Sequence, residues 1–160
     1  MGTVSRALVV YSTGAACTRA AAEAIADGIT RAGRVSTVVA SVHALQASRL
    51  DRSDIVVLGS EASDRAALAE LRLLSALLPA TALEAKMVSV FDAGPRGRCG
   101  HGARRLREGL RAADPALHLA APGISLEVDP RSHELPEPEL LRCRQFGEHL
   151  AGIAAAAGTG

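Results

Sequence analysis

The stretch Ala7 to Ile29, ALVVYSTGAACTRAAAEAIADGI, decides the fold of this chain. It begins with a short apolar run, Leu8 to Val10, which is typical of a buried strand. A turn of small and hydroxyl-bearing residues follows at Ser12 to Thr18, and apolar residues then recur at helical spacing from Ala22 to Ile29. The first N–H groups of a helix have no partner within it, and the helix dipole is positive there. The turn is therefore predicted to bind an anion, preferably a phosphate.

Two common phosphate loops do not fit this turn. A P-loop places a glycine, a lysine and a serine or threonine at the start of the helix, whereas Ala16, Cys17 and Thr18 stand here. The dinucleotide-binding fingerprint needs three glycines, and the turn contains only Gly14. An ordinary helix start, with Thr18 serving only as its N-cap, stays open as an alternative to a phosphate site.

Strand-like and helix-like segments alternate along the chain. This alternation predicts right-handed crossovers and a parallel sheet. Helices are predicted at residues 18–32, 64–78, 102–113 and 138–156, with a short turn at 44–48. The predicted strands are Ala7 to Tyr11, Val35 to Ala40, Ile55 to Gly59, Met87 to Phe91 and Leu117 to Ala121.

Length, charge and composition limit the classes of function. The 160 residues suit a single domain, predicted at residues 1–157 with a disordered tail at 158–160, because domains commonly have roughly 100–150 residues. The net charge of +1 argues against nucleic acid or a membrane as the main partner, and the few aromatic residues give little surface for stacking on bases. No signal peptide or membrane span is visible, so the protein is expected in the cytoplasm.

Three segments of the chain resemble parts of flavodoxins. Val9 to Thr18 is similar to their phosphate loop: two apolar residues, the aromatic Tyr11, hydroxyls, a small residue and a threonine at the start of the helix. Ala16 departs from the pattern, because that position is usually glycine. Val57 to Ser60 resembles the strand that leads into the first flavin loop, and Val90 to Gly94, with Cys99 and Gly100, resembles the second. The segment before the last helix is similar to that of short-chain flavodoxins.

The resemblance implies a fold, a cofactor and a set of contacts. The fold is a doubly wound, five-stranded parallel sheet in the order 2-1-3-4-5, with helices on both faces and the ligand at the carboxyl ends of strands one, three and four. The cofactor is FMN. The residues implied for its phosphate are Ser12, Thr13, Gly14, Ala15, Ala16, Cys17 and Thr18, and those for its ring are Ser60, Glu61, Ala62, Asp92, Ala93, Gly94, Arg96 and Cys99.

The implied function is electron transfer by non-covalently bound FMN. The protein would be a redox carrier, or a component of an FMN-dependent oxidoreductase, rather than a hydrolase; it would be a monomer or a weak homodimer and would meet a redox partner protein or a reductase. The ring loops lack the usual aromatic residues, whose stacking contacts are worth about 0.5–1.5 kcal/mol each. A second function therefore stays open: a flavodoxin-fold protein that has lost or weakened FMN binding and acts as a binding or scaffolding module.

Other chemistry receives less support from the sequence. Cys17 at a helix N-terminus has the position of a reactive thiol, but free cysteine is more often a small buried residue, and we favour that interpretation. Cys99 and Arg105 match the spacing of phosphatase loops, a short match that we interpret as accidental. The arginines of the predicted fourth helix indicate a solvated face rather than a docking patch. The cysteines and histidines have no ligand spacing, so no metal site is expected.

Overall fold

The computed structural model describes residues 5–12, 15–77, 83, 85–117, 119 and 123–158. Strands and helices alternate, as the sequence predicts. The elements are β1 (Ser5–Tyr11), α1 (Ala16–Arg31), β2 (Val35–Ser41), η1 (Val42–Ala44), α2 (Ala47–Arg52), β3 (Ile55–Glu61), α3 (Asp64–Leu77), β4 (Met87–Gly94), α4 (His101–Ala113), β5 (Ile124–Glu127) and α5 (Glu137–Gly158).

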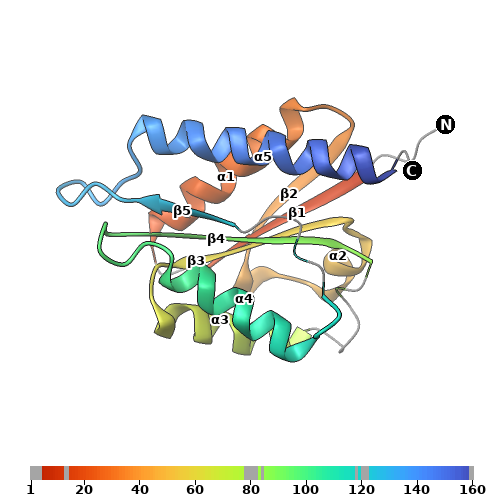
Figure 1. Cartoon of the computed structure of the whole chain (residues 1–160), viewed down its shortest axis with the longest axis horizontal. Coiled ribbons are helices and arrows are strands. Elements are labelled where there is room, and N and C mark those ends of the chain that lie inside the picture. Colours follow the sequence, from red (N-terminus) through yellow and green to blue (C-terminus); the bar gives the residue numbers. More distant parts are fainter. Residues whose placement is uncertain are drawn as a thin grey trace.

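The five strands form one parallel sheet in the order β2-β1-β3-β4-β5. Helices α1 and α5 cover one face, and α2, α3 and α4 cover the other (Figure 1). Val9, in the middle of β1, pairs in register with Val39 of β2 and Val57 of β3. The predicted doubly wound fold and its strand order are confirmed.

Strand β1 is apolar throughout its centre because both of its faces are buried. Ala7 and Val9 pack in the core beneath α1 and α5, whereas Leu8 and Val10 pack in the core on the opposite face. Successive side chains of a strand point to opposite faces, so a strand between two helical layers needs an unbroken apolar run. That run is the sequence feature from which β1 was predicted.

Helices α1 and α5 approach each other closely because each has a glycine at the contact. A Cβ atom at Gly28 would collide with the carbonyl oxygen of Arg144, and one at Gly147 would collide with that of Ile25. The two backbones therefore touch where any side chain would separate them. This contact holds α5 against α1, and the two helices together cover one face of the sheet (Figure 1).

The last strand differs from the prediction. We predicted Leu117 to Ala121, but the strand that pairs with the carboxyl half of β4 is β5 at Ile124–Glu127. Leu117 packs in the core with α4, and Leu119 makes one isolated parallel bridge to Val88. Residues 118, 120 and 121 lie outside the described part of the chain. Both segments are short, and Ile124–Glu127 alternates apolar with polar residues. Pairing with β4, which is not a local property, decides between them.

Several helix boundaries also differ by one or two residues. The first helix begins at Ala16 rather than at Thr18, and α5 continues to Gly158, two residues past its predicted end. The predicted turn at 44–48 is replaced by the short helices η1 and α2. The predicted end of the third helix, Leu78, is outside the described residues.

No helix in the described ranges is long and apolar enough to cross a membrane.

Candidate functional site

The carboxyl ends of β1, β3 and β4 lie together at the edge of the sheet on the left of Figure 1. The chain leaves β1 toward α1 on one face and leaves β3 toward α3 on the other, so the connections diverge at this point. Such a divergence opens a crevice that suits a ligand. The loops that reach this edge are residues 12–15, 62–63 and 95–100, of which 13 and 14 are outside the described part.

The turn between β1 and α1 is held by Thr18. Its hydroxyl donates to the carbonyl oxygens of Ser12 at 2.7 Å and Ala15 at 2.8 Å, and the residue is fully buried. Thr18 is the third residue of α1, and Ala15 is the N-cap, so the hypothesis that Thr18 is only an N-cap is wrong. Thr18 clamps the turn from inside instead of presenting a donor to a ligand.

The N-terminus of α1 has no side-chain cap from the residues that the structure describes. Ala15 is the N-cap, and it has no hydroxyl or carboxylate to accept a hydrogen bond. The first N–H groups of a helix need an acceptor from outside the helix. Thr18 does not supply it, because its hydroxyl is buried and bonds carbonyl oxygens of the turn. Ala16 is exposed at this end. An anion is the acceptor that this arrangement favours, since the helix dipole is positive here.

Cys17 is a buried residue of this helix start. Burial raises the pKa of its thiol, and the negative charge of Glu61 raises it further. A reactive thiol needs a lowered pKa, so the structure agrees with the interpretation of Cys17 as a small core residue. Glu61 lines the same cavity as Ser12 of this turn, so its carboxylate opposes the binding of an anion there.

The two loops implied for the flavin ring touch each other. The N–H of Ala62 donates to the carbonyl oxygen of Ala93 at 3.0 Å. A Cβ atom at Gly102, in the first turn of α4, would collide with the carbonyl oxygen of Glu61 and lie 2.8 Å from Ser60 Oγ. Position 102 must therefore be a glycine for the loop after β3 to pack against α4.

The side chains implied for the ring differ in where they lie. Glu61 and Cys99 are half-buried, and Arg96 is exposed. The others are buried and form the base of the two loops, so only their backbone atoms are available to a ligand. The buried ones are Ser60, Ala62, Asp92, Ala93 and Gly94.

Asp92 caps a helix. Its Oδ2 accepts hydrogen bonds from the N–H groups of Gly100 at 2.9 Å and Ala103 at 3.1 Å, and the residue is fully buried. Gly100 is the N-cap of α4 and has a φ of +96°, which favours glycine. The carboxylate at the end of β4 thus holds the start of α4 and the loop at 95–100 in place. Sequence reasoning gave Asp92 a ligand contact, and the structure gives it a supporting role.

Cys99 does not form a phosphatase loop. Its Sγ lies 3.3 Å from the carbonyl oxygen of Gly94 and 3.2 Å from that of Leu126. Burial raises the pKa of this thiol, and nearby carboxylates, first that of Asp92, raise it further. Arg105 forms an ion pair with Glu108 at 3.6 Å. The match between Cys99 and Arg105 in sequence is accidental, because a phosphatase needs a thiolate and a free guanidinium on one anion.

The outer loop of the ring site is polar. The Arg96 side chain is 91% exposed and lies 3.9 Å from a carboxylate oxygen of Glu127, so water and this neighbour screen its charge. Arg98 is exposed as well. The segments 61–63 and 95–100 are fully described, and neither contains an aromatic side chain. Among the described residues, no group of three or more His, Cys, Asp or Glu is placed to hold a metal ion.

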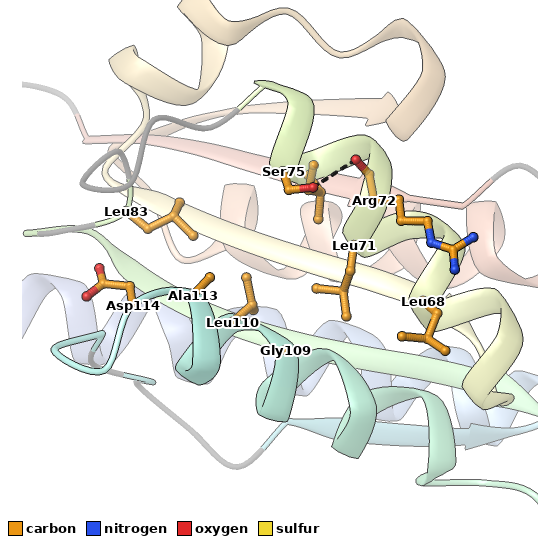
Figure 2. Close-up of a pocket in the computed structure, with 10 residues that line it drawn as sticks. Leu68, Leu71, Arg72, Ser75, Leu83, Gly109, Leu110, Ala113 and Asp114 are labelled. Carbon is orange, nitrogen blue, oxygen red and sulfur yellow. Dashed lines mark hydrogen bonds between the residues drawn. The ribbon is translucent and has the colours of Figure 1, made fainter.

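Two of the cavities in the described structure adjoin α3. One, of about 280 Å³, is mainly lined by leucines of α3 and α4, such as Leu68, Leu71 and Leu110 (Figure 2). It borders the C-terminal half of α4, which returns toward the amino ends of the strands, and so it is remote from the carboxyl-end crevice. The other, of about 320 Å³, adjoins that crevice and is lined by Ser12 and Glu70 among others. The sequence analysis did not identify Glu70.

Comparisons with known proteins give structural matches only. No family model and no curated protein sequence matches the chain. A solved flavodoxin from the domain Archaea is 21% identical, with a TM-score of 0.77, over 93% of this chain and 99% of that one.

Two further matches agree with the first. The oxidised Flavodoxin 1 of Bacillus cereus is 19% identical, with a TM-score of 0.71, over 92% of this chain and 98% of that one. The Flv1 flavodiiron core of Synechocystis sp. PCC6803 is 20% identical, with a TM-score of 0.70; the match covers 97% of this chain but 37% of that one. The chain therefore has the flavodoxin fold over almost its whole length.

Proposed function

We propose that this protein binds FMN non-covalently at the carboxyl-end crevice and transfers electrons. The observation that carries the proposal is the uncapped N-terminus of α1, held open by Thr18 at the point where the connections diverge. Bound FMN supplies the redox chemistry, and the protein supplies its position and electrostatic surroundings. The names of the structural neighbours, flavodoxins and a flavodiiron core, agree with this function.

The 5′-phosphate would be bound by the turn at residues 12–18. The N–H groups at the start of α1, at Ala16 and Cys17, are the donors that the described part of the turn offers to it. A doubly charged anion at a helix N-terminus is stabilised by these donors and by the helix dipole. Glu61 weakens this site without blocking it, because its carboxylate adds a negative charge nearby.

The flavin ring would lie against the loops at 61–63 and 95–100, bound by backbone groups and by the exposed side chains there. It would gain no aromatic stacking, so FMN should bind less tightly than it does to a protein with such contacts. We further propose a cytoplasmic redox carrier or oxidoreductase component that is a monomer or a weak homodimer. Its partner would be a second redox protein or a reductase.

Titration of FMN with the purified protein tests this function. We expect saturable quenching of flavin fluorescence and a change in the visible absorption spectrum, because the ring leaves water for the loop surface. If neither signal changes at high micromolar protein, the electron-carrier function is wrong, and a binding or scaffolding module on the same fold remains.

A negative charge added at the start of α1 tests the phosphate contact. Ala16→Asp places a carboxylate at an exposed helix start, where it should leave the free energy of unfolding unchanged or raise it slightly. The same carboxylate should weaken FMN binding by roughly tenfold or more, because like charges then face each other. The matched control is Ala47→Asp, at the exposed start of α2. Equal FMN affinity in both variants would show that the phosphate lies elsewhere.

A further inference from the structure

Glu70 occupies a core position of α3. The buried residues of this helix are Ala67, Glu70 and Leu74, which share one face at helical spacing. Glu70 is only 1% exposed, and neither of its carboxyl oxygens has a hydrogen-bond partner among the described residues. Burial raises the pKa of this carboxyl well above its ordinary value of 4.5. An apolar side chain would serve the fold better here, so the carboxyl calls for another explanation.

A cavity adjoins Glu70. Its volume is about 320 Å³, and it extends between α3, η1 and the carboxyl ends of β1 and β3. Ser12 lines it as well, and the buried Oγ of Ser12 has no hydrogen-bond partner in the described chain. Three unpartnered oxygen atoms therefore belong to two residues that line one cavity. Buried oxygens without a partner are uncommon in proteins and call for an explanation, of which a bound ligand is one.

The chemistry of the lining selects a class of ligand. Glu61 contributes a second carboxylate to it, while Val42 and Leu73 contribute apolar surface. A carboxylate and a hydroxyl oxygen both accept hydrogen bonds, so the ligand must donate several, and a cation would favour the ionised carboxylate. The described residues offer no metal-binding group. His43 and Arg65 also line the cavity, but both are exposed and so lie toward its mouth.

We propose that this cavity binds a small alkylammonium ligand, with the ammonium group paired to Glu70 and Ser12 and the alkyl chain packed on Val42 and Leu73. This site borders the proposed FMN site and shares Ser12, Glu61 and Ser63 with it. It does not depend on FMN binding. The unfavourable burial of Glu70 is then explained by the ligand that it binds.

The test is calorimetric titration of the full chain, without FMN, with n-butylammonium chloride. n-Butanol has the same shape without the charge, and butyrate has the opposite charge. We expect saturable binding of butylammonium alone, with chemical-shift changes at the backbone amides of Ala66 and Ala69 in the cavity wall. The proposal is overturned if butylammonium does not bind at millimolar concentration, or if butanol binds equally well.

Two variants assign the binding to Glu70. Glu70→Gln keeps the shape and removes the charge, and it should reduce the affinity for butylammonium by about 10- to 100-fold, the value of a hydrogen bond to a charged group. Since removal of an unpaired buried acid should not unfold the protein, lost binding reports on the site. Glu108→Gln, at an exposed residue of α4, is the control and should bind as the wild type does. Unchanged affinity in Glu70→Gln overturns the proposal.

The pH dependence gives a second readout. Butylammonium affinity should rise as the pH rises, because the ligand needs the ionised form of Glu70, whose pKa is raised. Glu61, His43 and Arg65 also face the cavity, and His43→Gln removes the contribution of the histidine from the comparison. In Glu70→Gln the rise should disappear. A rise that is equally steep in Glu70→Gln contradicts the assignment of the cation to Glu70.

Discussion

Replacement of Glu70 by leucine should raise the free energy of unfolding by about 2–4 kcal/mol at neutral pH, because leucine does not leave a polar group buried without a partner. Glu70 is fully buried without a hydrogen-bond partner in the described part of the chain. Burial raises the pKa of this carboxyl, so the ionised form is disfavoured in the folded state. The carboxyl also loses its hydrogen bonds to water. Leucine avoids both costs on the face of α3 that contains Ala67 and Leu74.

The gain from Glu70→Leu should depend on pH in a defined direction. A carboxyl with a raised pKa binds its proton more tightly in the folded state. The contribution of Glu70 to the free energy of unfolding is fully present below the ordinary pKa of 4.5. It is lost as the pH rises through the pKa of the folded state. The difference between variant and wild type should therefore grow from about pH 4.5 upward. Urea unfolding at several pH values measures this difference. The control is Glu108→Gln, whose free energy of unfolding should lie within about 0.5 kcal/mol of that of the wild type. A constant or negative difference would contradict this description of Glu70.

Replacement of Asp92 by alanine should lower the free energy of unfolding by about 2–4 kcal/mol. The variant loses two hydrogen bonds to a charged group, and it leaves the N–H groups of Gly100 and Ala103 without their acceptor. Because Asp92 is fully buried, water does not replace it freely. Asp92→Asn keeps the shape and one acceptor oxygen, and so it should lose less.

Urea unfolding and amide hydrogen exchange check this prediction together. In Asp92→Ala the amides of Gly100 and Ala103 should exchange faster than in the wild type, because the start of α4 frays. FMN affinity should fall as well, since the loop at 95–100 is then less well ordered. If Asp92→Ala is as stable as the wild type, the carboxylate does not hold α4, and its direct contact with the ring would have to be reconsidered.

The first half of the sheet could be predicted because its signals are local. The apolar run of β1, the small-residue turn and the spacing of Ala22 to Ile29 each point to one element, and both faces of β1 are buried. The last strand had two candidates of similar length. The choice of Ile124–Glu127 depended on pairing with β4, which lies far away in the sequence.

The crevice at the carboxyl ends of the strands could be predicted, but the hydrogen-bond partners of its side chains could not. Strand order alone places the crevice at the carboxyl ends of β1, β3 and β4. Whether Thr18 and Asp92 face a ligand or the interior depends on the turn of α1 and on the contact between β4 and α4. Glu70 has one signal in the sequence, its helical spacing from Ala67 and Leu74, but a single glutamate in a helix is normally solvated.

The claim that the N-terminus of α1 binds a phosphate group is tested most directly by comparing FMN with riboflavin, which has the same ring and ribityl chain without the phosphate. Both affinities are measured by quenching of flavin fluorescence in the same buffer, at low and high salt. We predict that riboflavin binds roughly 100-fold more weakly or worse, as expected when charge-assisted hydrogen bonds are lost, and that salt weakens only the binding of FMN. Equal affinity for the two flavins would contradict it.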